Sequence, residues 1–206
     1  MKTTTRKHLS PLERREQIVM AADAVLQRVG VNDFTIDKVI ESLGIAKGTV
    51  YKYFETKDDV LAEVSIKALN QLLNYFKLSE RNSPEGIEKT RAVIMSCYYF
   101  GQDQSRYFEL LVYMERPEFL TISDAYLEIS NKLTNWYSSH IASQQEKGHI
   151  RKDIEPLVAN YMTWGSCMGV MQFLDAKRIF IENNDEITQK QLMEAYVDVM
   201  IKGMGA

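Results

Sequence analysis

The chain has 206 residues, of which 45% are hydrophobic and 26% charged, with ten glycines and four prolines. A chain of this length can bury a sizeable core, so its stability need not depend on disulfides or metals, and the scarcity of Gly and Pro favours helices over a turn-rich β architecture. The formal net charge is −3, but residues 1–57 carry a net +3 and the remainder −6. A mildly basic head on an acidic body is compatible with nucleic-acid binding at one end only.

The two cysteines, Cys97 and Cys167, are 70 residues apart and lack the paired spacing of a metal site, which suits a reducing cytoplasm. We interpret both as core or pocket-wall residues. No stretch approaches the roughly 20 apolar residues of a membrane span, and nothing near the N-terminus resembles a signal-peptide cleavage site. We therefore expect a cytoplasmic protein with no membrane partner.

The N-terminal residues carry clear helix boundaries. Ser10 to Glu13 (SPLE) is a capping box with proline at the first helical position, which predicts a helix over 11–29 that stops at Gly30. Thr35 is the expected cap of a second helix, over 36–43, whose apolar stripe ends before Gly44.

A third short helix is expected over 47–54, with Val50 and Phe54 facing inward. Thr56 caps a fourth helix that runs past Leu72. Two short helices joined by a glycine-containing turn, with another helix packed behind them, are the helix-turn-helix arrangement, in which the second short helix enters the major groove of DNA.

The segment TIDKVIESLGIAKGTVYKYFETKDDVL, residues 35–61, closely resembles the DNA-binding signature of the Tet-repressor family. The resemblance runs from Arg14 to Leu61, and it implies a recognition helix at residues 47–53 with DNA contacts at the matching positions. Lysine donates to guanine O6 or N7, glycine lets the backbone approach the groove, and hydroxyls and helix-terminal N–H groups suit phosphates. We predict DNA contacts from Thr35, Lys47, Gly48, Thr49, Tyr51, Lys52, Tyr53 and Lys57.

Ordinary structural roles remain open for these residues. Tyr51 and Tyr53 can pack against the small core, and Lys47 and Lys52 can be solvated surface lysines. A tyrosine can also do both, with its ring on the core and its hydroxyl on a phosphate.

Two positions depart from the family pattern. Ala46 stands where the family usually has Ser or Thr, so the recognition helix lacks a side-chain cap worth about 1 kcal/mol. Asp37 lies close to where DNA would bind, where it favours the helix N-terminus, repels phosphate or accepts from a cytosine amino group. The operator sequence therefore cannot be carried over from a relative.

The rest of the chain predicts a second helical domain. Residues 78–86 (LSERNSPEG) are polar and turn-rich and are the expected linker, with Ser83-Pro84 restarting a helix. Further helices are expected at about 84–101, 105–115, 121–147, 156–176 and 188–203. The predicted fold is all-α, with an N-terminal three-helix helix-turn-helix DNA-binding domain over 1–61 and a larger helical effector-binding and dimerisation domain over 62–206.

Of the 21 aromatic residues, 17 lie after residue 61. They can be core and nothing more, but the family resemblance implies a ligand cavity in this domain. One stripe of the helix at 121–147 offers an aromatic wall with a single polar group, made by Ile122, Tyr126, Ile129, Leu133, Trp136 and His140. We predict a cavity lined by Tyr98, Tyr107, Tyr113, Tyr126, Trp136, His140, Trp164 and Met168, with a hydrogen-bonded core histidine as the alternative for His140.

The helix over 157–174 is apolar nearly all round, so more than one of its faces must be covered. Gly165 and Gly169 allow a neighbouring helix to approach closely. The resemblance implies that this helix and the last one pair with their symmetry mates as a four-helix homodimer interface, and a buried helix in a monomer is the alternative.

The predicted function is a ligand-responsive transcriptional repressor, released from operator DNA by a small, largely apolar or aromatic effector. The alternative is a DNA-binding protein whose second domain binds a protein partner or only dimerises. Nothing indicates an enzyme, a catalytic residue, a cofactor or a bound metal, because there is no phosphate-binding glycine loop, His8, His140 and His149 lack metal-ligand spacing, and Cys97 has no identifiable base.

Overall fold

The computed structural model describes residues 9–119, 123–183 and 187–206, and within these ranges the chain forms ten helices and no β-strand. The all-α prediction is confirmed. Residues 1–8, with His8, and the expected stripe residue Ile122 lie outside the described residues. None of the helices in the described ranges combines the length and the apolar content that crossing a bilayer requires.

The N-terminal part, which we call the head, contains α1 (Pro11–Val29), α2 (Ile36–Leu43), α3 (Lys47–Tyr51) and the first turns of α4 (Lys57–Asn82). The predicted caps are present: the side chains of Ser10, Thr35 and Thr56 accept hydrogen bonds from the first-turn N–H groups of α1, α2 and α4. Gly44 ends α2 in the left-handed conformation, with φ 60°. Local sequence signals therefore determine most of the head.

Helix α3 is shorter than the predicted 47–54. Its N-cap, Ala46, makes no side-chain hydrogen bond, and the helix ends at Tyr51. The chain then continues as a hydrogen-bonded turn in which the N–H groups of Tyr53 and Phe54 donate to the carbonyl of Val50. Val50 and Phe54 are buried as expected, so core contacts within α3 and just after it hold a helix too short to be stable alone.

The prediction of a linker at 78–86 was wrong for residues 78–82, because α4 continues to Asn82. Phe76, buried in the core, holds the helix in place near its end. The restart at Ser83-Pro84 was also wrong: α5 (Ile87–Asp103) begins after Gly86, whose φ of 116° is unfavourable for other residues. The break between α4 and α5 is thus only four residues long.

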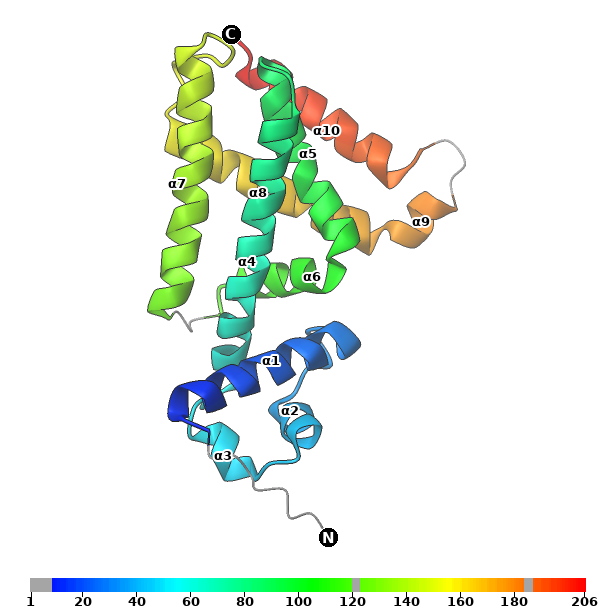
Figure 1. The fold of residues 1–206 in the computed structure, drawn as a ribbon. Helices are drawn as coiled ribbons and strands as arrows, with labels where there is room; N and C mark the ends of the chain where they lie inside the picture. The colour runs from blue at the N-terminus through cyan, green and yellow to red at the C-terminus, as the bar shows by residue number, and fades with distance from the viewer. Residues whose placement is uncertain (1–8, 120–122, 184–186) are drawn as a thin grey trace.

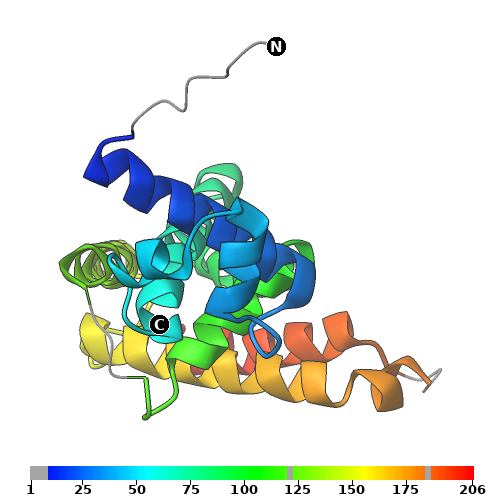
Figure 2. The ribbon, with the colours of Figure 1, turned by 90° about the horizontal axis from the view of Figure 1, so that it is seen from below.

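The remaining helices form the body. They are α6 (Ser105–Met114), α7 (Asp124–Glu146), α8 (Pro156–Ala176), α9 (Arg178–Glu182) and α10 (Gln189–Met204). Only the short α9 was not expected. In Figure 1, α4 stands between α7 and α5, α8 crosses behind α4, and α6 lies between the body and the head. Figure 2 shows α8 and α10 along one side of the molecule, away from α1.

One continuous apolar core runs from the head into the body, and α4 contributes to it along its whole length. The head packs on the body through α4 and through contacts of α6 with α1. The expected domain boundary near residue 61 therefore falls inside a helix that both parts share.

Gly101 on α5 leaves room for side chains of α8 and α6. A β-carbon at this position would collide with the end of the Met171 side chain and would lie 3.7 Å from the ring of Phe108. Gly48 is the contrasting case, because nothing lies within 4 Å of the β-carbon that a substitution would add there.

We predict that Gly101→Leu lowers the free energy of unfolding by about 1–3 kcal/mol, because the added side chain overfills the α5–α8 seam. Gly48→Leu should change it by no more than about 0.5 kcal/mol. Urea unfolding at matched protein concentration measures both values. Equal free energies of unfolding for the two variants would show that the contact between α5 and α8 accommodates the added side chain without loss of stability.

Candidate nucleic-acid interface

Helix α3 lies at the end of the molecule farthest from the C-terminus (Figure 1). Beside it is a surface hollow formed by the start of α1, the α2–α3 turn and α3. Exposed on this end are Lys47, Gly48, Tyr51 and Lys52, while Val50 points into the core. A short helix presented in this way, with its outer face uncovered, has the form of a recognition helix.

The residues of α3 that are predicted to contact DNA differ in whether their side chains already have a partner within the protein. Nζ of Lys47 lies 3.0 Å from Oδ1 of Asp37 and 5.5 Å from the centre of the Tyr51 ring. Asp37 raises the pKa of Lys47, so this ammonium stays charged. Lys52 is exposed with no partner in the described part of the chain, and the backbone at Gly48 is open. Lys52 and Gly48 are therefore available to DNA without rearrangement.

The structure narrows the three roles that the sequence left open for Asp37. Its carboxylate is exposed on the same end of the head as α3 and is paired with Lys47. An exposed pair of this kind contributes little to stability. To contact a phosphate or a base, Lys47 would first have to leave this partner.

The hydroxyl of Thr35 accepts from the backbone N–H of Lys38 at 3.3 Å, and Thr49 and Tyr53 are half-buried. Lys57 lies elsewhere than expected. Its ammonium donates to the carbonyl of Val31 at 2.8 Å and lies 5.1 Å from the centre of the Tyr113 ring, at the junction of head and body. Burial lowers its pKa. In this structure its donors serve the junction and not the outer surface.

Two residues of α1 were missed as candidates. Arg14 and Gln17 line the hollow beside Lys52 and Tyr53, and Nη1 of Arg14 donates to Oε1 of Gln17 at 2.6 Å. The sequence placed both on the first helix but offered no sign of which neighbour they face. Their position adds one cation and one amide to the surface around α3.

Within the body, a small cavity of about 20 Å³ lies between α4, α5, α7 and α8. We call it the inner cavity. In its empty state it has room for a single water-sized molecule, well below the size of a pocket that holds a drug-sized ligand. Its lining is Phe76, Val93, Ile94, Cys97, Leu133, Tyr137, Asn160, Thr163, Trp164 and Cys167.

The eight residues predicted to line a cavity do not gather around this one. Trp164 alone lies on its wall, and its Nε1 donates to Glu115 at 3.0 Å. Tyr98 lines a separate outer groove near α9, Met168 is buried elsewhere in the core, and Tyr126 is half-buried. Helical spacing predicted that Tyr126, Trp136 and His140 lie on one face of α7. In the structure, different neighbouring helices pack on different parts of that face, so the three side chains have different surroundings.

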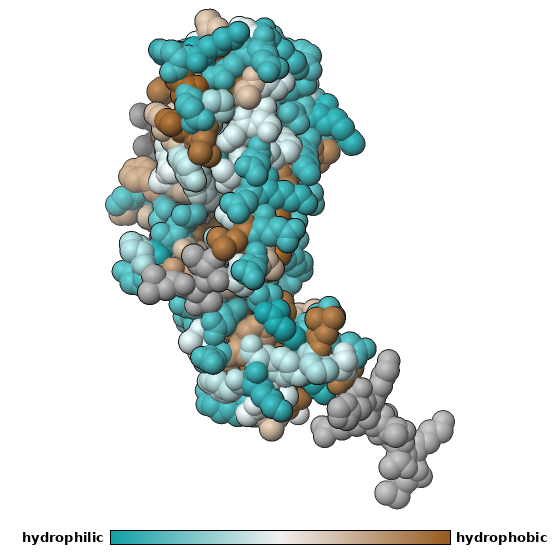
Figure 3. Space-filling model, turned by 90° about the vertical axis from the view of Figure 1, so that its left-hand side faces the viewer, coloured by the Kyte–Doolittle hydropathy of each residue, from teal (hydrophilic) through white to brown (hydrophobic). Residues whose placement is uncertain are grey.

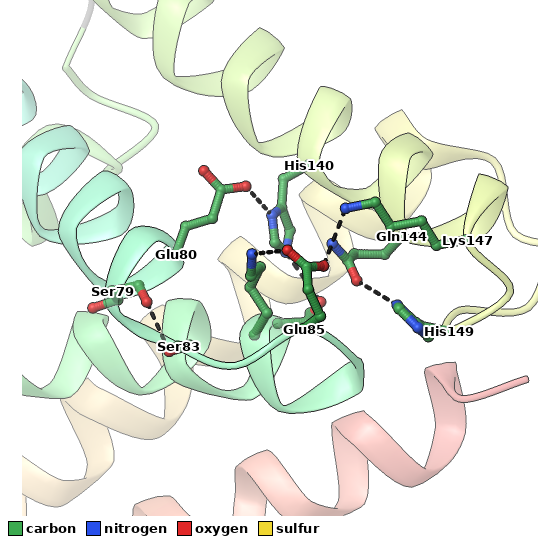
Figure 4. A network of polar contacts seen from close by, with 10 residues as sticks. Ser79, Glu80, Ser83, Glu85, His140, Gln144, Lys147 and His149 are labelled. Carbon is green, nitrogen blue, oxygen red and sulfur yellow. Dashed lines mark hydrogen bonds and ion pairs between the residues drawn. The ribbon is translucent and has the colours of Figure 1, made fainter.

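His140 is the hydrogen-bonded core histidine that was the alternative interpretation. Figure 4 shows it pointing from α7 toward Glu80 of α4, where Nδ1 lies 2.7 Å from Oε1. Nε2 lies 3.0 Å from the Thr90 hydroxyl, and the ring stacks on Trp136. Burial lowers the pKa of His140, against the effect of Glu80. The group ties α4, α5 and α7 together at the end of the body far from the head.

Tyr107 and Tyr113 lie at the head–body junction. The hydroxyl of Tyr107, on α6, donates to Oδ1 of Asp23 on α1 at 2.8 Å. Asp23 also pairs with Lys67 of α4 at 2.5 Å. The hydroxyl of Tyr113 donates to Asp58 at the start of α4, again at 2.8 Å. Each tyrosine therefore links the body to a different helix of the head.

Helix α8 presents an uncovered apolar face. Its exposed side chains include Leu157, Val158, Tyr161, Met162 and Phe173, and both Gly165 and Gly169 have open space where a β-carbon would be. Figure 3 shows a mainly hydrophilic surface on the α7 side, with apolar side chains gathered toward one margin of the body. Exposed apolar area of this kind marks an interaction surface.

No group of three potential His, Cys, Asp or Glu metal ligands comes together in the ranges that the structure describes. Cys97 and Cys167 are free thiols, both buried on the wall of the inner cavity. The Cys167 thiol and burial raise the pKa of Cys97, which disfavours the nucleophilic thiolate.

Comparison with known proteins agrees with this geometry. Residues 18–64 match the family model of the bacterial regulatory proteins of the tetR family. An uncharacterized HTH-type transcriptional regulator of Haemophilus influenzae is 26% identical over 88 residues, which cover 43% of this chain and 47% of the relative. The chain thus matches about half the length of that protein.

Longer matches extend into the body. The fatty acid metabolism regulator protein of Bacillus subtilis is 22% identical over 151 residues, covering 73% of this chain and 77% of the relative. A solved structure of a protein of unknown function from Rhodococcus sp. RHA1 has the same fold, with a TM-score of 0.73, 14% identity and coverage of 99% of this chain and 100% of that one.

The matched segment contains the larger part of α1, all of α2 and α3, and the start of α4, which together make the head. The fold of the whole chain, body included, is also that of its structural neighbour. The head of this chain therefore carries, over residues 18–64, the DNA-binding segment described for the bacterial regulatory proteins of the tetR family.

Proposed function

We propose that this protein is a transcriptional repressor that binds operator DNA as a homodimer through α3 and is released when a small, largely apolar molecule enters the body. The observation that supports DNA binding most directly is the exposed face of α3, where Lys52 and the open backbone at Gly48 stand beside Arg14. Lysine and arginine suit guanine edges and phosphates, and only a bare backbone can approach the groove closely.

Dimerisation explains the uncovered face of α8. Symmetric pairing of α8 and α10 with their copies buries the exposed apolar side chains, and the two open glycines of α8 allow close helix contact. Two heads in one dimer then address half-sites one DNA turn apart, about 34 Å. Only one separation of the heads engages both half-sites together.

Release requires that the body move the head, and the junction tyrosines are suited to this. Tyr107 and Tyr113 fix α6 to α1 and α4 through carboxylates. A ligand that separates the body helices shifts α6, and these two hydrogen bonds transmit the shift to the head. Linkage then requires that operator DNA weaken ligand binding by the same factor.

One observation favours the alternative function, in which the body only dimerises or binds a protein. The empty inner cavity of about 20 Å³ must enlarge before it admits an effector. Titration of the protein on the DNA upstream of its own gene, with and without aromatic and lipophilic compounds, separates the two functions. Compound-dependent release supports the sensor, and release by no compound supports the alternative.

We predict that Lys52→Ala weakens operator binding about five- to a hundredfold and, where Lys52 contacts a phosphate, reduces the salt dependence by about one ion. Lys132→Ala, an exposed lysine of α7, is the matched control and should bind like the wild type. Fluorescence anisotropy with labelled operator at several salt concentrations measures both. Unchanged affinity of Lys52→Ala would remove this residue from the interface.

Met162→Lys on α8 should convert the dimer to a monomer, because it places a charge in the apolar contact. Met162 is 58% exposed in the single chain. Met20 is the control, because it is also exposed, at 74%, but lies on α1, outside the proposed interface. Met20→Lys should leave the dimer intact. Light scattering at micromolar concentration gives the masses, and a wild-type monomer would contradict the proposed interface.

Tyr107→Phe should lower operator affinity by up to about fivefold, because the loss of the bond to Asp23 costs about 1 kcal/mol of head positioning. Tyr75→Phe is the control, since the Tyr75 hydroxyl also donates to a carboxylate, that of Asp103, but within the body. Equal operator affinity of the two variants would show that the Tyr107 bond does not set the head position.

A further inference from the structure

The wall of the inner cavity contains neutral side chains only, among the residues that the structure describes. Apolar and aromatic side chains from four helices make half of it, and the other five residues bring two thiols, two hydroxyls and the Asn160 amide. The indole N–H of Trp164 donates to Glu115. A ligand in this cavity therefore meets apolar side chains and hydrogen-bonding groups, and none of these groups carries a charge.

Two of these polar groups are neighbours. Thr163 acts as a hydrogen-bonding neighbour that lowers the pKa of Tyr137 against the larger effect of burial. Neither hydroxyl has a hydrogen-bond partner at normal geometry, and the side chains are only 3% and 4% exposed. A buried polar group without a partner is costly, and proteins rarely leave two such groups on one cavity wall. Each hydroxyl can donate one hydrogen bond and accept others, so together they offer a place for one oxygen atom of a ligand.

Among the described residues, the cavity wall offers no cation to pair with a carboxylate. His140 is the nearest titratable base along α7, but Glu80 and Thr90 occupy both of its ring nitrogens, and burial lowers its pKa. Glu115, on the indole N–H of Trp164, is itself an anion. An ionised carboxylate in a low-dielectric cavity without a paired cation is strongly disfavoured.

We infer that the inner cavity, once the helices around it separate and enlarge it, binds a compact neutral molecule, apolar except for one uncharged oxygen group such as a ketone or an alcohol, which is held by Tyr137 and Thr163. This inference rests on the proposed function and specifies its effector class. By this inference the ligand is uncharged, unlike the ligand of a regulator that recognises a free fatty acid through its carboxylate. The related Bacillus subtilis protein is named for fatty acid metabolism, and its name alone does not carry over to this cavity.

The experiment compares four probes of similar shape: acetophenone, 1-phenylethanol, ethylbenzene and benzoate. Calorimetric titration into the full-length wild-type protein should give the tightest binding for the ketone and the alcohol. Benzoate should bind at least about tenfold more weakly, because its charge is unpaired in the cavity. Trp164 on the wall gives an independent signal, since its emission should change when the cavity fills.

Two variants remove the hydroxyls singly. Tyr137→Phe and Thr163→Val should each weaken acetophenone about five- to tenfold and leave ethylbenzene unchanged. Without ligand, Tyr137→Phe should raise the melting temperature, because it removes a buried hydroxyl that has no partner. Ser138→Ala is the control: its hydroxyl is also buried and unpartnered but does not line the cavity, so probe binding should not change.

Three results would overturn the inference: benzoate binding as tightly as acetophenone, no binding of the ketone or the alcohol at millimolar concentration, or equal loss of acetophenone and ethylbenzene in both hydroxyl variants. If either variant fails to fold, the other decides. The release mechanism is judged separately, by operator anisotropy with and without acetophenone. Bound ketone with unchanged operator affinity supports the cavity assignment and contradicts release by this ligand class.

Discussion

The shared helix α4 is the constraint on which the rest of the structure depends. Its first turn is held by the Thr56 capping box and by Asp58, which Tyr113 contacts from the body, and its last turns carry Glu80 against His140. Because one unbroken helix connects these contacts, the head cannot rotate without moving a wall of the body core. A four-residue break separates it from α5, so the next helix packs back along it directly. Any signal from the body reaches α3 along α4 or through α6.

Local sequence signals predicted most of the fold. Caps at Ser10, Thr35 and Thr56, and glycine at position 44, set boundaries that the structure reproduces, because each depends on hydrogen bonds within one turn. The failures occurred where tertiary contacts outweigh composition. Residues 78–82 look like a linker by their polarity, but packing of the preceding turns, with Phe76 in the core, keeps them helical.

The candidate sites divide in the same way. The exposed residues of α3 could be found from a local pattern, because a short helix has only one outer face. The cavity could not. Tyr137 and Thr163 meet only through the packing of α7 on α8, and no periodicity distinguishes them from the neighbouring Trp136, whose ring stacks on His140 instead. The cysteines were expected on the core or a pocket wall, and both are buried on the cavity wall, since small apolar side chains leave space where helices cross.

The shortness of α3 has a consequence for how such a regulator can evolve. Only Val50 within the helix, and Phe54 just after it, hold this segment on the core, while its outer positions touch nothing that the fold requires. Selection can therefore exchange Lys47, Gly48 or Lys52 and retarget the protein to a new operator at almost no cost in stability. The body, with its cavity and its uncovered α8 face, is inherited unchanged through such a switch. Under the proposed function, copies of this gene are thus free to diverge in the DNA they address while responding to the same molecule.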